Sequence, residues 1–284
     1  MKVILSRKGF DSAAGGYASI ITPDNKLVSL PIPLDDNTRY SDLRFDNKKN
    51  YYEVMKGLNT KIKRNGAWKE LTEEDKCHLD PDLRRDVTDR IDGWKACFGQ
   101  NEKEQTHLEG NGVGEGDLFL FFGWFRKTEL DGDVLRFVKS DKGSHVIFGY
   151  LQIDKVHHIG EDTPLPRPWM KDHPHAGERL RKTVNNVIYE STDKLSWDDK
   201  FSGAGVFSYD KRLVLTKDSL SRSKWDLPEC FKNVKITWQS SSPWKPEGYF
   251  QSSMRGQEFV IEDNEQVENW AKQIIKTVVL KEKV

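Results

Sequence analysis

The chain has 284 residues, enough for one large domain or two small ones with a complete hydrophobic core. Only 36% of the residues are hydrophobic and 32% are charged, but nine Trp and regularly patterned apolar residues argue against a disordered chain. Acidic and basic residues number 45 each, which argues against the basic excess of proteins that wrap bare duplex DNA and leaves room for a local basic patch.

The three cysteines, Cys77, Cys97 and Cys230, form no CxxC pair and no even-numbered disulfide framework. This usage fits a reducing compartment and argues against a cysteine-based zinc site. The first residues hold too few apolar side chains for a signal peptide, and no run approaches the roughly 20 apolar residues of a membrane span. We therefore expect a cytoplasmic protein without a membrane segment.

The first predicted elements are the strands of a small β-meander over residues 2–33. Val3–Leu5 form the first strand, and Ser19–Thr22 and Leu27–Ile32 flank a turn at residues 23–25. Prolines near residue 32 end the last strand or keep it at an edge.

Two amphipathic helices are predicted next. Apolar residues at i, i+4, i+7 and i+11 predict a helix over residues 51–65, with Gly66 as its stop. A stripe of apolar residues four apart predicts a second helix over residues 81–91. Asp80 stands where its N-cap belongs, and Pro81 stands at its first helical position.

The stretch 113–159 is strongly β in character. Leu118–Phe122 is so apolar that it must be buried on both faces, as a central strand is. A charged turn at residues 131–132 follows it, and further strands are expected at Val134–Val138, His145–Gln152 and Ile153–Ile159.

Residues 160–182 are rich in proline and polar residues and predict a long ordered loop. Short strands are expected at Val187–Tyr189 and Leu213–Leu215. An amphipathic helix is expected over residues 264–280, opened by a capping box of Asp263 and Gln266. With no linker and no repeat, we expect one domain over residues 1–284 with its β core at about residues 113–215.

A glycine-rich turn over residues 9–16 follows the first strand, with Arg7 and Lys8 just ahead of it. Such a turn can direct backbone N–H groups at a phosphate, so Arg7, Gly15 and Gly16 are candidate nucleotide-binding residues. The turn lacks the ending of a P-loop and the spacing of a dinucleotide fingerprint. The alternative is a hairpin whose backbone requires positive φ.

The segment His78–Asp82 places an imidazole and two carboxylates two residues apart, on one face of an extended segment. This arrangement suits an acid/base pair of His78 and Asp80 and, less well, a metal site. The alternative is purely structural: Asp80 caps the following helix and Asp82 complements its dipole.

Gln100, Gln105 and His107 are expected in a polar loop before the β core. A Gln amide can pair in a bidentate way with the edge of a base, and the alternative is a solvated loop. His145 is expected at the start or edge of a core strand. Trp225, beside basic residues, is a candidate for stacking a base, or else covers the end of the β core.

No metal site is expected. His173 and His175 lie two residues apart, which suits a metal, but no third ligand is identifiable in the sequence. Trp124 and Trp270 are expected in the core. No serine, cysteine or metal-hydrolase signature is present, and the sequence specifies neither a cofactor nor an oligomeric state.

Three segments followed by a fourth, at residues 6–16, 77–83, 116–126 and 145–152, together resemble the nucleotide modification associated domain proteins of bacteria and phages, specifically the third type. The resemblance spans nearly the whole chain. It implies a link to systems that hypermodify bases in DNA, and a nucleotide or a nucleic acid with a modified base as the partner. It also implies a set of pocket residues without assigning their roles: Arg7, Asp11, His78, Asp80, Gln100, His107 and His145.

A second likeness concerns residues 113–159 only. An apolar strand after Gly-Asp, a turn and a second apolar strand are similar to the core of the PUA, EVE and ASCH barrels. In those folds such strands line a pocket for a flipped or modified base, although the N-terminal part here is far longer than such barrels carry. The expected fold is therefore α+β, with a mixed, partly closed barrel-like sheet, peripheral helices and a C-terminal amphipathic helix.

Three functions follow from these patterns. The first is a nucleotide-directed enzyme of DNA base modification, with phosphate near Arg7 and with His78, Asp80 and His107 as catalytic groups. The second is a non-catalytic reader of a modified base with a stacking pocket. The third is a structural or interaction protein of a phage-defence or modification operon. Convergence of the polar residues on one cavity would favour the enzyme.

Overall fold

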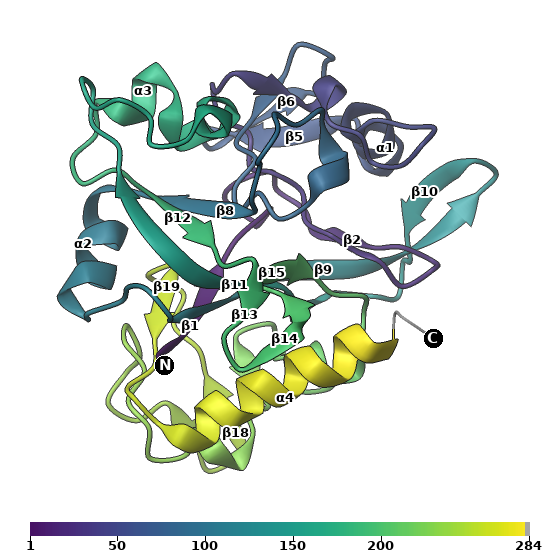
Figure 1. Ribbon diagram of the computed structural model, residues 1–284. Coiled ribbons are helices and arrows are strands. Elements are labelled where there is room, and N and C mark those ends of the chain that lie inside the picture. The colour runs from purple at the N-terminus through teal and green to yellow at the C-terminus, as the bar shows by residue number, and fades with distance from the viewer. Residues whose placement is uncertain (282–284) are drawn as a thin grey trace.

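The structure is a computed structural model that describes residues 1–281. It has the mixed α+β fold that the sequence predicts, with a curled half-barrel sheet and a C-terminal helix (Figure 1). Among the described residues, no helix combines the length and apolar character needed to cross a membrane.

The large sheet is built around β9, which the sequence predicts as a central strand. Its main path runs in the order β19 (Glu258–Val260), β1 (Val3–Arg7), β9 (Leu118–Asp131), β11 (Ser144–His158), β12 (Val187–Ser191) and β8 (Cys97–Gln100). The strands that branch from this path are β2 (Ser19–Ile21), β3 (Leu27–Val28), β10 (Val134–Phe137) and β15 (Ala204–Val206). The start of β9, Leu118–Phe122, is buried throughout, because the sheet is covered on both faces there.

β1 and β2 lie parallel to β9, whereas β10 and β11 are antiparallel to it. β11 joins the two strands expected at 145–152 and 153–159 into one. Its register against β9 shifts between Ile147 and Gly149, and such bulges increase the local twist of a sheet.

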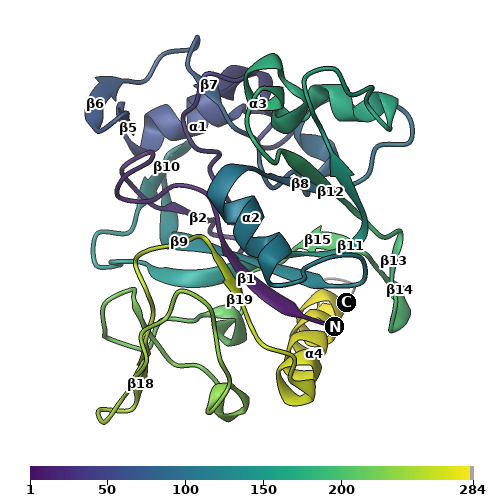
Figure 2. The same ribbon diagram turned by 90° about the vertical axis from the view of Figure 1, so that its left-hand side faces the viewer.

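Smaller strands and helices cover this sheet. The minor pairs are β4 (Thr38–Arg39) with β7 (Lys76–Cys77), β5 (Lys61–Arg64) with β6 (Ala67–Glu70), and β13 (Lys194–Leu195) with β14 (Asp198–Ser202). A further sheet has the order β16 (Lys224–Trp225), β18 (Tyr249–Gln251) and β17 (Trp244–Lys245). The helices are α1 (Tyr51–Leu58), α2 (Glu102–Gly110), α3 (Glu178–Arg181) and α4 (Glu265–Lys281). α1, the β5–β6 hairpin and α3 lie above the sheet, and α4 lies below it (Figures 1 and 2).

The helix predicted over residues 51–65 is correct only in its first half. α1 ends at Leu58, and the chain turns back as the β5–β6 hairpin. Asn65 and Gly66 form the hairpin turn with φ of 51° and 79°. Asn-Gly is the preferred pair for such a turn because both residues tolerate positive φ. Ile62 is buried as a residue of strand β5, so its helical spacing from Tyr51 does not reflect a shared helix.

The helix predicted over residues 81–91 is absent. The backbone N–H and C=O of Asp82 both bond to Cys97, which holds this segment extended beside β8. A 3-10 turn at Arg85–Val87 is its only helical part. The polar loop predicted around Gln100 and Gln105 is also wrong, because these residues lie in β8 and α2.

Two further expectations need adjustment. Residues 160–182 hold 3-10 turns at Pro168–Asp172 and Pro174–Ala176 and the short helix α3. In place of a strand at Leu213–Leu215 there is a 3-10 turn at Lys211–Leu213, followed by a single bridge between Val214 and Val146.

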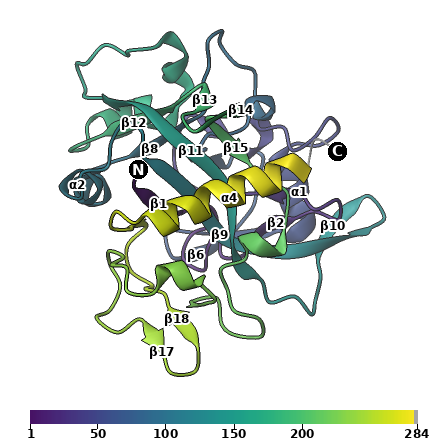
Figure 3. The ribbon, with the colours of Figure 1, turned by 60° about the horizontal axis from the view of Figure 1, so that its bottom comes forward.

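The C-terminal helix is confirmed as α4. It lies across one face of the sheet (Figure 3) and buries Val267, Ala271 and Ile275. Its first turn is capped by Asn264, whose Oδ1 accepts from the backbone N–H groups of residues 266 and 267. The predicted cap Asp263 instead pairs with Lys2.

Candidate functional site

A cavity of about 390 Å³ opens where β1, β8 and the start of β11 meet the segments above the sheet. This volume falls within the usual range of small-molecule sites. Its lining includes these residues singled out from the sequence: Arg7, Asp11, His78, Asp80, Gln100 and His145. Residues that lie far apart in the chain therefore share one wall, together with His175 and Arg179, which the sequence does not mark as site residues.

In the glycine turn, the backbone N–H groups of Gly15 and Gly16 already have acceptors within the protein. The N–H of Gly15 donates to Lys63 O, and that of Gly16 donates to Asp11 O. A Cβ on Gly15, whose φ is 80°, would overlap the Phe10 ring. These glycines are therefore explained by the alternative hairpin interpretation, although Asp11 of the same turn lines the cavity.

Gln105 and His107 lie outside the cavity lining. The Gln105 Oε1 accepts from the hydroxyl of buried Tyr189 at 2.8 Å. His107 Nε2 lies 2.9 Å from Thr237 Oγ1, and its ring packs against Trp238 with a centroid separation of 4.8 Å. Their contacts are those of residues that dock α2 onto its surroundings, and His107 lies outside the lining that contains His78.

Trp225 lies outside the cavity lining and contacts it through His145. It is 1% exposed, so its ring cannot receive a base from solvent. Its indole N–H donates to His145 Nδ1 at 3.0 Å, which leaves Nε2 as the N–H donor of that imidazole. Burial, with smaller contributions from the charges of Arg222 and Arg7, lowers the pKa of His145 to about 3, so the ring is neutral at pH 7.

Trp124 lies on the cavity wall, where the sequence predicts Trp225 as a stacking residue. The sequence predicts Trp124 in the core, whereas its side chain is half-buried and lines the cavity. The guanidinium of Arg222 lies over its ring at 3.7 Å from the centroid. This cation–π contact fixes the indole as a wall of the site. Trp270 is also half-buried and packs edge-on against Phe231.

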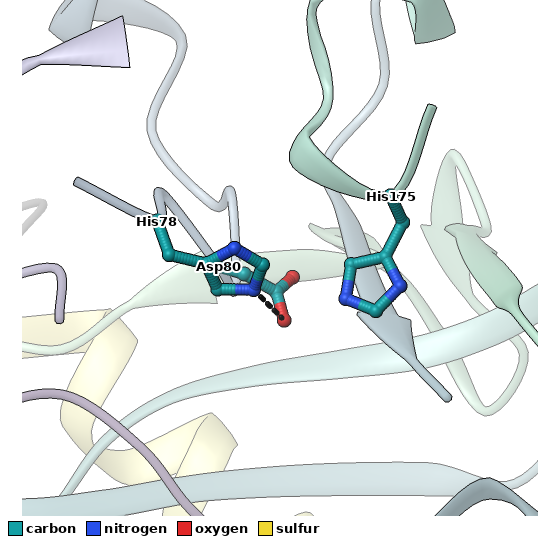
Figure 4. A group of neighbouring side chains, drawn as sticks. All are labelled: His78, Asp80 and His175. Carbon is teal, nitrogen blue, oxygen red and sulfur yellow. Dashed lines mark ion pairs between the residues drawn. The ribbon is translucent and has the colours of Figure 1, made fainter. Parts of the chain in front are cut away.

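The reactive groups of the cavity form a cluster of His78, Asp80 and His175. The two imidazoles lie on either side of the Asp80 carboxylate (Figure 4). His78 Nε2 is 3.8 Å from Asp80 Oδ2, and one ligand atom from each residue lies within 4.8 Å of the others. His78 and Asp80 follow β7, whereas His175 comes from the 3-10 turn at Pro174–Ala176.

Asp36 orients His78. Its Oδ2 is 2.6 Å from His78 Nδ1, and its Oδ1 accepts from Arg179 at 2.7 Å. Burial alone would raise the pKa of Asp36, but the hydrogen bonds and charges of His78 and Arg179 lower it overall. Asp36 is 42 residues from His78 in the chain and lies in a polar segment, so no sequence signal marks it.

Asp80 and His175 are also held in place by neighbouring groups. Asp80 Oδ1 accepts from the N–H of Gly99 at 2.8 Å and lies 3.3 Å from His173 Nε2. Burial would raise the pKa of Asp80, but the nearby imidazoles, that of His173 first, lower it to about 2. His175 Nδ1 lies 2.6 Å from Asn186 Oδ1, and burial lowers the pKa of His175 to about 3 despite the charge of Asp80.

Arg7 brings a positive charge to the lining of the cavity. Its Nη2 donates to the carbonyls of Met254 and Gly256, at 3.0 and 2.6 Å. Among residues 1–281 these are the only hydrogen bonds of its guanidinium, so Nε and Nη1 have no protein acceptor there. A guanidinium held in this way matches the geometry of a phosphate.

Gln100 supports the wall through its side chain. Its Nε2 donates to buried Glu258 at 2.8 Å, and its Oε1 accepts from the N–H of Asn101. Lys8 Nζ also donates to Glu258, at 2.7 Å. Each end of the amide therefore has one partner in the protein, and these two hydrogen bonds hold Gln100 in the cavity wall.

Among the comparisons with known proteins, the match is to a protein family. The protein family described as nucleotide modification associated domain 3 matches residues 2–262. No curated protein and no solved structure is significantly similar to the chain.

Proposed function

The chain belongs to the nucleotide modification associated domain 3 family, whose description points to a role in a DNA modification system, and from this premise we propose that the cavity is the active site of an enzyme acting on a nucleotide or modified base. The observation that carries the proposal is the convergence of Arg7, His78, Asp80 and His145 on one cavity. Titratable groups held in fixed orientations within a concave pocket are typical of a catalytic site.

Arg7 is the proposed phosphate ligand. Its N–H groups that have no protein acceptor can pair with two phosphate oxygens. Phosphate binding rests on this side chain and not on the backbone of Gly15 and Gly16, whose N–H groups have other acceptors.

The base, or the group to be modified, is proposed to lie against the cluster of His78, Asp80 and His175. The neutral His145 offers an N–H donor to a base or sugar oxygen. His78 and Asp80 are the proposed catalytic residues, because His78 Nε2 and Asp80 Oδ2 lie 3.8 Å apart on the cavity wall. His107, outside the lining, has no part in this proposal.

A non-catalytic reader of a modified base is the second candidate, and Trp124 is the observation that favours it. Its ring lies on the wall and is braced by Arg222, as a stacking platform would be. The buried Asp36 carboxylate, however, orients the imidazole of His78. Such orientation is expected of a catalytic histidine and is not required for reading a base by stacking.

Calorimetric titration with canonical and modified nucleotides, and with the corresponding nucleosides, tests the proposal. Arg7→Ala is expected to weaken nucleotide binding by roughly tenfold or more, as loss of one charge-assisted pair does, and to leave nucleoside binding nearly unchanged. Arg85→Ala is the matched control, because Arg85 is exposed and does not line the cavity. The phosphate role is wrong if the control loses as much affinity.

His78→Ala separates the two candidates. The enzyme hypothesis predicts that this variant loses turnover of the bound ligand, followed by mass spectrometry, while its melting temperature stays near that of the wild type. Binding without any conversion by the wild type would identify a reader. A large loss of thermal stability in His78→Ala would show that the residue is architectural.

A further inference from the structure

We propose that His78, Asp80 and His175 form a binding site for one divalent transition-metal ion on the cavity wall. The sequence predicts no metal site, because it offers no third ligand for His173 and His175 and favours an acid/base or capping role for the segment His78–Asp82. The fold supplies that ligand by bringing His175 to the other side of Asp80 (Figure 4). The ligand atoms lie within 4.8 Å of one another, and bonds of about 2.0–2.2 Å to an ion would draw them closer.

Both imidazoles are oriented as metal-binding histidines are. The Nδ1 atoms face outward, that of His78 to Asp36 and that of His175 to Asn186, each at 2.6 Å. An Nδ1–H that donates to an oxygen leaves the lone pair on Nε2, the atom that turns toward the cluster. Hydrogen-bonded carboxylate and amide oxygens in this position raise ligand basicity and fix the ring.

The outer partners are themselves anchored. Asp36 accepts from Arg179, and Asn186 donates through Nδ2 to the carbonyls of Ile159 and His175, at 2.9 and 2.8 Å. Neither partner can therefore swing away without breaking other hydrogen bonds. Asn186 is 4% exposed and Asp36 is 7% exposed, so water does not compete strongly for these atoms.

Asp80 presents one oxygen to the cluster. Its Oδ1 accepts from the Gly99 N–H and lies near His173, whereas Oδ2 faces His78. Gly99 also makes room for the third ligand, since a Cβ at this position would overlap the His175 imidazole. The backbone of β8 thus fixes the carboxylate and the second imidazole together.

Two nitrogens and one carboxylate oxygen are the donors of a borderline ion such as Zn²⁺, Fe²⁺ or Co²⁺, and not those of Mg²⁺ or Ca²⁺, which prefer all-oxygen sites. Three protein ligands on the wall of a cavity leave positions open for water or substrate, which is the pattern of catalytic and not of structural sites. In the proposed enzyme such an ion would supply an activated water or hold a substrate oxygen. The site itself rests on its own geometry and not on the identity of the nucleotide.

Metal content and affinity of the full chain test the inference. Protein without a histidine tag, which would bind the same ions, is stripped with chelator and titrated with Zn²⁺, Co²⁺ and Mg²⁺ by calorimetry. One Zn²⁺ or Co²⁺ per chain is expected, with a Co²⁺ absorption spectrum showing nitrogen and oxygen ligation, and with Mg²⁺ bound far more weakly. Asp80→Asn and His175→Gln are each expected to lower affinity by at least roughly 100-fold, and Asp36→Asn by roughly 10–100-fold.

His158→Gln is the matched control, because His158 is exposed and outside the cluster. Circular dichroism of each variant confirms that a loss of metal is not a loss of fold. The inference is overturned if stripped wild type binds neither Zn²⁺ nor Co²⁺, if Mg²⁺ binds as tightly, or if the control loses as much as Asp80→Asn. In that case His78 would serve as a structural link between Asp36 and Asp80. Nucleotide binding by the stripped protein, measured separately, tests the proposed function independently of the ion.

Discussion

At the scale of single residues, the cavity depends on Gly99, which lies on β8 and faces the imidazole of His175. Because a side chain there would overlap the ring, we predict that Gly99→Ala displaces His175 and destabilises the fold by about 1–3 kcal/mol. Gly110→Ala, with no atom within 4 Å of its added Cβ, is expected to be neutral or to gain up to about 1 kcal/mol. Urea denaturation of the two variants measures this difference.

His145 predicts a pH dependence of stability. Its pKa is about 3 in the folded protein, against 6.5 ordinarily. Below 6.5 the unfolded chain binds a proton that the folded protein refuses, so this contribution is complete above pH 6.5 and is lost as the pH falls toward 3.

We therefore expect the unfolding free energy of the wild type to fall with decreasing pH more steeply than that of His145→Gln. The difference in slope should be roughly 1.4 kcal/mol per pH unit near about pH 5. Denaturation curves at several pH values provide the test, and parallel slopes would show that His145 is protonated in the folded protein.

At the scale of elements, α4 is an amphipathic helix whose start is set by one side chain. Asn264 Oδ1 accepts two backbone N–H groups of the first turn, whereas Asp263 is exposed and pairs with Lys2. Asn264→Ala is expected to lower the unfolding free energy by about 0.5–2 kcal/mol, as loss of an N-cap does. Asp263→Ala should change it by less than about 0.5 kcal/mol. A reversed order in thermal melts would restore Asp263 as the cap.

Element by element, periodicity predicts those parts whose burial is continuous. β9 and α4 are confirmed because an apolar run or stripe has only one way to be buried in each case. Periodicity fails at residues 81–91, where backbone pairing of Asp82 with Cys97 outweighs a local preference for helix. It also misses α2, whose polar composition looks like that of a loop, and β8, whose four residues are too few to show a period. The neighbours that cover them are β19 for α2 and β12 for β8.

At the scale of the whole molecule, the buried pair of Lys8 and Glu258 ties the N-terminal strand to β8 and β19. Glu258 is fully buried, and Gln100 also donates to it. Removing one partner leaves a buried charge unpaired, so Glu258→Ala is expected to cost about 3–5 kcal/mol. Exposed Glu262→Ala should stay within about 0.5 kcal/mol of the wild type in chemical denaturation. Equal effects would show that the pair does not contribute to stability.

The cavity wall combines early and late segments of the described residues, from Arg7 to Gln257, and one domain over residues 1–284 stays a prediction. We predict that tryptophan fluorescence and far-ultraviolet circular dichroism report the same unfolding midpoint in urea. Two separate transitions would divide the chain into independently folding units.

The sequence by itself determined the α+β class, the central apolar strand, the C-terminal helix and several cavity residues, because those follow from local composition, periodicity and a family resemblance. Only the tertiary structure decided which polar groups act together. Asp36 reaches His78 across 42 residues, and His175 reaches Asp80 from the separate 3-10 turn at Pro174–Ala176. Such partnerships arise from hydrogen bonds between segments that meet only after the sheet has formed, and no spacing along the chain records them.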